Sequence, residues 1–129
     1  MIVKHDQIEE HRLPGISHRT VAGTLQGLRS LEVWAQTVAP GAATPVHRHD
    51  CEEAIVILEG HGVLELGGRE EAFGPGQTLV IPRDAVHQVR CVGEQPLRLV
   101  AALAAAPVRV RTATNERIRL PWDAPDPAD

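Results

Sequence analysis

The sequence predicts an all-β sandwich or barrel, because short strand-like runs alternate with turn residues and no stretch shows a convincing helical period. Six runs have the composition of strands: Leu31–Val38, Glu53–Leu58, Gly62–Leu66, Gln77–Ile81, Val86–Val92 and Leu97–Leu103. Glycine, proline and charged residues separate these runs at intervals of about 8–12 residues, which is typical of sandwiches and barrels.

The chain has the size and composition of one soluble globular domain, with 129 residues, of which 43% are hydrophobic and 23% are charged. No run approaches the roughly 18 apolar residues of a membrane span. The N-terminus is charged from Lys4 onward and lacks the apolar run of a signal peptide. We therefore expect a single domain over residues 1–129 and a cytoplasmic location.

Two flanks surround the predicted core of residues 31–105: an N-terminal arm, residues 1–30, and a C-terminal tail, residues 107–129. In the arm, Thr20–Leu25 could add an edge strand, and a short helix could lie in Asp6–Arg12. Pro121, Pro125 and Pro127 in the tail cannot take part in a strand ladder. Leu120 and Trp122 are the expected anchors of the tail, and Asp123–Asp129 is expected to be loose.

Charge argues against a nucleic-acid partner. The net charge is −4, and the 13 lysines and arginines are scattered along the chain rather than gathered in a stripe. The densest basic stretch contains Arg109, Arg111, Arg117 and Arg119, and we interpret it as the solvent face of a strand and of the tail.

A cluster of potential metal ligands precedes one of the predicted strands. His47, His49, Cys51 and Glu53 share one parity, so an extended chain would present them on one face, whereas Glu52 would face away. Glu53 stands at the head of a continuous apolar run, where a buried carboxylate needs a partner because an unpaired buried charge is costly. A metal ion would be a suitable partner.

A second segment strengthens this interpretation: the apolar strand after Gly76 enters a turn at Pro82 and leaves it with His87. With this segment the sequence resembles the cupin superfamily. The first cupin motif, Gly, five residues, His-x-His, three or four residues, Glu, six residues, Gly, is matched from Gly41 to Gly60. The second motif is matched at Gly76, Pro82 and His87, but Asp84 replaces its second glycine and Cys91 its asparagine. The fifteen residues between the motifs, 61–75, are similar to the spacing in small microbial cupins of the cupin 2 type.

The resemblance implies a single cupin domain, a six- to eight-stranded double-sheet jelly-roll β-barrel that holds one divalent transition metal. By carry-over, the metal ligands are His47, His49, Glu53 and His87. Iron or manganese is favoured for oxygen chemistry, and nickel or zinc is compatible with the same ligands. The tolerance of aspartate for unusual backbone angles suggests that the turn survives at Asp84.

Three functions follow from such a site. The leading hypothesis is a dioxygenase-like oxidoreductase acting on a small organic substrate, with Glu53 as a ligand or as a proton acceptor. The alternatives are a non-redox isomerase or lyase acting on a small acid or sugar, and a binding or sensing module without turnover. The resemblance also implies a homodimer.

The remaining histidines and the two cysteines are less informative. Cys51 and Cys91 could line the metal cavity, join the ligands or be oxidised, but small buried thiols are their commonest state. His61 is expected in an exposed turn, and His5, His11 and His18 are expected at the surface.

Overall fold

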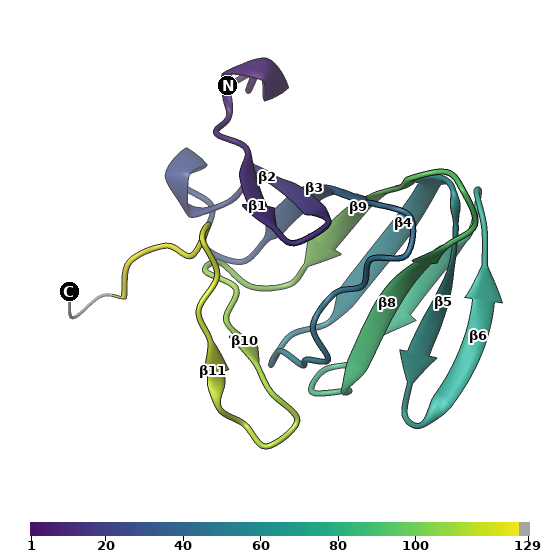
Figure 1. Ribbon diagram of the computed structural model, residues 1–129. Coiled ribbons are helices and arrows are strands. Elements are labelled where there is room, and N and C mark those ends of the chain that lie inside the picture. The colour runs from purple at the N-terminus through teal and green to yellow at the C-terminus, as the bar shows by residue number, and fades with distance from the viewer. Residues whose placement is uncertain (127–129) are drawn as a thin grey trace.

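Antiparallel strands form two facing sheets in the computed structural model, which describes residues 1–126 (Figure 1). The larger sheet contains, in spatial order, β1 (His11–Leu13), β2 (Ile16–Ala22), β3 (Glu32–Val38), β9 (Leu97–Leu103), β4 (Glu53–Glu59) and β7 (Thr78–Ile81). The smaller sheet contains β6 (Arg69–Phe73), β5 (His61–Leu66) and β8 (His87–Val92). The predicted all-β, double-sheet jelly roll is therefore confirmed.

A hairpin of β10 (Val110–Arg111) and β11 (Arg117–Ile118) lies beside the smaller sheet (Figure 1). Single bridges link Ala43 to Arg90, His47 to His87 and Arg48 to Arg111. The segment 43–48 therefore lies between β8 and β10 and joins the hairpin to the sheet. Because of these bridges, the His-x-His segment is part of the barrel and not a free loop.

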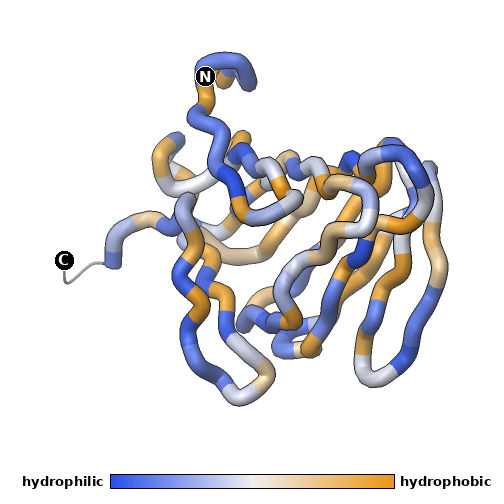
Figure 2. The backbone as a smooth tube through the Cα atoms, viewed as in Figure 1, coloured by the Kyte–Doolittle hydropathy of each residue, from blue (hydrophilic) through white to orange (hydrophobic). Residues whose placement is uncertain are grey.

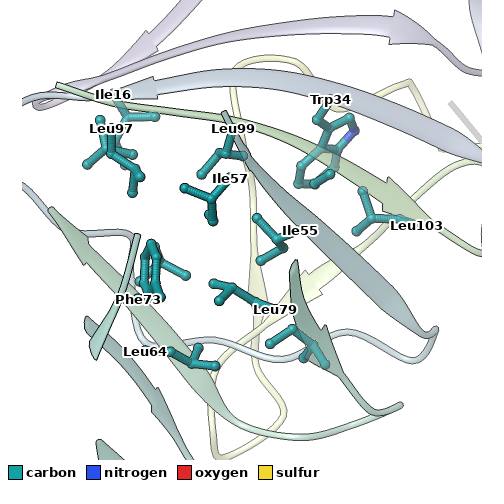
Figure 3. Packing of buried hydrophobic residues seen from close by; sticks show 14 of the residues in the cluster. Ile16, Trp34, Ile55, Ile57, Leu64, Phe73, Leu79, Leu97, Leu99 and Leu103 are labelled. Atoms are coloured by element: carbon teal, nitrogen blue, oxygen red, sulfur yellow. The ribbon is translucent and has the colours of Figure 1, made fainter. Parts of the chain in front are cut away.

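The core lies between the two sheets. Along β4 the buried residues Glu53, Ile55 and Ile57 alternate with more exposed ones, and apolar residues are found along the strands of both sheets (Figure 2). Figure 3 shows side chains of the larger sheet, such as Leu99, packing toward Phe73 and Leu64 of the smaller one. Full burial of each large aliphatic side chain contributes roughly 1.5–3 kcal/mol to folding.

The six predicted strands are found with ends shifted by one residue at most, while β6 in the core was missed and the strands of the flanks were incompletely predicted. β6 was missed because Arg69–Phe73 is mainly charged and exposed on most of its length. β2 is an internal strand between β1 and β3 and not an edge strand. The N-terminal segment that could have been helical contains only the 3₁₀ turn η1 (His5–Gln7) before β1, and a second turn, η2 (Thr24–Gln26), follows β2. Among residues 1–126, no helix is long and apolar enough to cross a membrane.

The tail is better ordered than the sequence suggested. The Arg117 guanidinium donates hydrogen bonds to both carboxylate oxygens of Asp126, and Arg109 lies 3.1 Å from the same carboxylate. The Asp123 carboxylate accepts a hydrogen bond from the backbone N–H of Leu120. The expectation of a loose segment is therefore wrong for residues 123–126, and residues 127–129 lie outside the described part. Arg109 and Arg117 are only 17% and 20% exposed, so they do not form a solvent face.

Candidate metal centre

Two ladders place the four predicted ligands at one end of the barrel. His87 begins β8 and exchanges two backbone hydrogen bonds with His47, at 2.9 and 3.0 Å, while Glu53 begins β4. The backbone N–H of Asp84 donates to the carbonyl of His49 at 2.9 Å, so the turn before β8 also supports the second histidine. Asp84 has a φ of 63°, the left-handed conformation that glycine supplies in the family motif. The left-handed conformation is therefore kept at this position with aspartate in place of glycine.

The four side chains lie close together and are largely buried. His47, His49 and His87 each offer a nitrogen, and these three atoms lie within 4.8 Å of one another. Glu53 Oε1 lies 3.0 Å from Nε2 of His49 and 3.4 Å from Nε2 of His87. His49, His87 and Glu53 are 1%, 2% and 7% exposed, whereas Glu52 is exposed, as its parity predicted.

Backbone carbonyls fix the orientation of the three imidazoles. Nδ1 of His47, His49 and His87 lies 2.6, 3.2 and 2.9 Å from the carbonyl oxygens of Pro45, Cys51 and Ala85, respectively. Because a carbonyl can only accept, Nδ1 donates in each pair, and Nε2 is the nitrogen left for a ligand. Orientation of the ring through its other nitrogen is characteristic of metal-binding histidines.

Within the cluster, Nε2 of His87 is buried and has no hydrogen-bond partner among the described residues. His87 Nε2 approaches Glu53 Oε1 at 3.4 Å, but the geometry does not meet that of a hydrogen bond. An unpartnered buried polar atom is costly unless something satisfies it. Three imidazole nitrogens around a carboxylate form a donor set that fits a divalent transition-metal ion.

Without a metal, the site holds a buried ion pair. Burial alone would lower the pKa of His49, but hydrogen bonds with Cys51 and Glu53 outweigh it and raise that pKa to about 10. Burial would likewise raise the pKa of Glu53, but the hydrogen bond from His49 and the nearby imidazole of His87 lower it to about 2. Burial and the neighbouring His87 lower the pKa of His47 to about 4. At neutral pH, His49 is therefore protonated, Glu53 is ionised and His47 is neutral.

An apolar pocket opens beside this cluster and shares three of its side chains. The space open to the centre of a water-sized sphere is about 50 Å³. The pocket is lined by Leu13, Ile16, Trp34, Gln36, Thr44, Pro45, His47, Glu53, Ile55, His87, Val89, Leu99, Ala101, Val110, Leu120 and Trp122. Hydrophobic residues dominate this lining and the polar ones are few, as in sites for small organic molecules.

The described lining of this pocket includes neither Cys51 nor Cys91. The Cys51 thiol lies 3.8 Å from Nδ1 of His49, next to the ring nitrogen that faces the backbone. The Cys91 thiol donates to the carbonyl of Gln95 at 3.3 Å. Both are buried and free, the commonest state for such thiols.

Sequence reasoning missed one residue near the pocket. His18 was expected at the surface but is 1% exposed, and its ring stacks on the indole of Trp122. The alternation of Ile16, His18 and Thr20 along one strand face was the available signal. It could be used only after β2 was known to lie inside the sheet. His61 is exposed, as expected.

Comparison with known protein families matches residues 2–124 to the family described as Auxin binding protein, a family of cupins. The chain belongs to this family. It is 40% identical to Auxin-binding protein 1 of Arabidopsis thaliana, over 85% of this chain and 65% of that protein. It is 41% identical to Auxin-binding protein T85 of Nicotiana tabacum, over 79% of this chain and 61% of that protein. The chain therefore spans somewhat less than two thirds of the length of these curated relatives.

Solved structures confirm that the chain has the cupin fold. The polyketide cyclase RemF from Streptomyces resistomycificus is 26% identical, with a TM-score of 0.72, and covers 95% of this chain and 88% of its own. A predicted oxalate decarboxylase from Thermotoga maritima has a TM-score of 0.72 over 81% of this chain and 99% of its own, and at 18% identity it shows the fold alone. The assignment to the small microbial type of cupin stays a prediction.

Proposed function

We propose that this chain binds one divalent metal ion on His47, His49, Glu53 and His87 and holds a small organic ligand in the apolar pocket beside it. The observation that carries the proposal is that His47, Glu53 and His87 belong to both the polar cluster and the pocket lining. A ligand in the pocket would therefore contact the metal site directly. The relatives named for auxin binding support a small organic ligand, and auxin (indole-3-acetate) is the first compound to test.

The residues of the pocket divide between a polar and an apolar end. The bound ion would act as a Lewis acid toward an oxygen atom of the ligand. Trp34, Trp122 and the aliphatic residues would cover an apolar or aromatic ligand body and exclude water, while Gln36 and Thr44 supply the remaining polar groups of the lining. A small aromatic or aliphatic carboxylate has both of the required ends.

Isothermal titration of indole-3-acetate into metal-loaded and metal-free protein tests the proposal, with Zn²⁺ and Mn²⁺ as the loading ions. We expect binding to the loaded protein and binding at least about tenfold weaker without metal. His49→Ala should abolish both the stoichiometric metal and the ligand binding. Glu52→Ala is the matched control, because this neighbouring carboxylate is exposed and should leave both unchanged. Equal binding with and without metal would contradict the proposal.

An enzymatic function is the second candidate, and the 26% identity to the polyketide cyclase RemF over most of the chain favours it. That likeness supports catalysis but does not indicate the reaction; one form of the candidate is a metal-dependent oxidoreductase of the dioxygenase type, for which iron or manganese is the expected metal. The role of Glu53 as a proton acceptor is weakened, because the imidazoles beside it hold its pKa low. Oxygen uptake by iron-loaded protein with a bound ligand would support this version. Conversion of the ligand under anaerobic conditions would instead favour an isomerase or a lyase.

A further inference from the structure

We propose that His18, a residue outside the metal centre, is a positioning residue that fixes two side chains of the ligand pocket, Gln36 and Trp122. The inference rests on the proposed function, because it concerns the pocket that would hold the ligand. It adds a residue that does not line this pocket, so His18 would act through its neighbours and not by contact with the ligand.

Hydrogen bonds fix both the tautomer and the plane of the His18 ring. The amide nitrogen of Gln36 lies 2.9 Å from Nδ1, and the hydroxyl of Thr20 lies 2.7 Å from Nε2. An amide nitrogen can only donate, so Nδ1 accepts and Nε2–H donates to Thr20. The chain Thr20–His18–Gln36 thus crosses from β2 to β3, where His18 and Gln36 are directly paired. Through this chain His18 holds the amide of Gln36 in one orientation.

Ring stacking fixes Trp122. The centroids of the His18 and Trp122 rings are 3.7 Å apart and their planes differ by 8°, while Trp34 meets both rings edge-on, at 5.0 and 5.8 Å. Trp122 lies beyond β11, in a part of the tail that belongs to no strand. The stack on His18 is therefore a main contact that sets the plane of this indole against the pocket.

The chemistry of His18 favours positioning over simple core filling. A buried imidazole is costly unless both nitrogens are paired, whereas an aliphatic or phenyl side chain would fill the same space without that cost. Burial, together with the nearby His11, keeps the ring neutral by lowering its pKa to about 3. What histidine provides here and an apolar residue does not is a flat ring for Trp122 combined with an acceptor for Gln36.

Three variants separate these contributions. His18→Phe keeps a flat ring but loses both hydrogen bonds, His18→Leu loses the stack as well, and Thr20→Val removes only the partner of Nε2. His61→Leu is the control, because His61 is exposed. For metal-loaded protein, we expect the Kd for indole-3-acetate to rise about 5- to 10-fold in His18→Leu and less in the other two. The metal content should stay at about one equivalent per chain in every variant.

A double-mutant cycle distinguishes positioning from a structural role. In a Gln36→Leu, Trp122→Leu background, the further change His18→Leu should alter the Kd less than about 2-fold, because the residues through which it acts are absent. The same 5- to 10-fold loss in both backgrounds would overturn the proposal. So would an unchanged Kd in His18→Leu.

A measurement without ligand keeps the inference separate from the proposed function. The chain has two tryptophans, so Trp34→Phe leaves Trp122 as the only fluorescent indole. In metal-free protein of this background, His18→Leu should increase quenching of Trp122 by acrylamide about 2-fold or more, and His61→Leu should not change it. If wild-type protein does not bind indole-3-acetate but the quenching rises, the choice of ligand is wrong and the positioning role stands. If the quenching is unchanged, the positioning role is wrong whatever the ligand.

Discussion

Metal binding is expected to release a proton from His49. In the metal-free site, the pKa of this imidazole is raised to about 10 beside the ionised Glu53. A metal ion needs the neutral ring as a ligand. At pH 7 the proton must therefore leave a group whose pKa lies about three units above the solution pH. At 1.36 kcal/mol per unit, the metal-binding free energy is reduced by roughly 4 kcal/mol.

This proton makes the affinity for the metal ion depend on pH. Because deprotonation favours the metal-bound form, metal affinity should rise about tenfold per pH unit and level off near pH 10. His47 does not contribute in this range, since its pKa is lowered to about 4 and the ring is already neutral. An imidazole of ordinary pKa is also neutral at pH 8.5, which makes this the pH at which the contribution of His49 is best isolated.

Calorimetry in buffers of different ionisation enthalpy measures this proton. At pH 8.5 the heat of Mn²⁺ or Ni²⁺ binding should vary with the buffer, with a slope of about one proton per ion. In Glu53→Gln the slope should fall, because the carboxylate that holds the proton on His49 is absent. A heat independent of the buffer at pH 8.5 would refute the reasoning, because His49 would then be neutral before metal arrives.

Three further predictions concern stability and assembly. Folding lowers the pKa of His18 to about 3, so the stability that the neutral ring provides is present above pH 6.5 and is lost as the pH falls. Between pH 6.5 and 4, urea titration should show the free energy of unfolding of wild type falling by roughly 3 kcal/mol more than that of His18→Phe, because the lowered pKa of His47 affects both proteins alike. Asp84 has a φ of 63°, so Asp84→Val should lower the free energy of unfolding by about 1–2 kcal/mol, while Asp84→Gly should be close to neutral in the same urea titration. The sequence also predicts a homodimer, and because β1 and β7 are the edges of the larger sheet, pairing at one of them would cover an unpaired strand. Light scattering should then give about 28 kDa, twice the 14.0 kDa of one chain, and a mass near 14 kDa would contradict the dimer.

The placement of the polar cluster was predictable because its members lie at fixed spacings in two short segments. His47, His49 and Glu53 share a parity before an apolar strand, and His87 leaves a proline turn, so local sequence determines where each side chain points. The survival of the turn with Asp84 in place of glycine was also predictable, because aspartate tolerates the left-handed backbone conformation that this position requires. Contacts between distant segments were not predictable in this way. The stack of His18 on Trp122 joins residues more than a hundred positions apart, and neither residue has a local pattern that indicates its partner.

The tail illustrates the same limit. Pro121 and Pro125 lie beyond the paired strands β10 and β11, and a loose end was inferred from the terminal position of Asp123–Asp129, but ordering of the tail requires only buried partners. Arg109 and Arg117 supply them by pairing with Asp126, and the charges that suggested a solvated surface are the groups that hold the segment. Sequence could identify Leu120 and Trp122 as anchors, since both are apolar residues in a polar tail, and both line the pocket. It could not show what they pack against.

The pocket therefore has two parts of different origin. The polar cluster comes from the motif segments of the core, and the apolar lining is completed by residues of the flanks: Leu13, Ile16, Val110, Leu120 and Trp122. Because the flanks supply no member of the polar cluster, changes there can alter the shape of the ligand site without altering the metal donors. Two cupins with the same four polar residues could thus hold the same ion and accept different ligands. For this chain, the choice of ligand is expected to depend on the N-terminal strands and the tail, which is where His18 joins them.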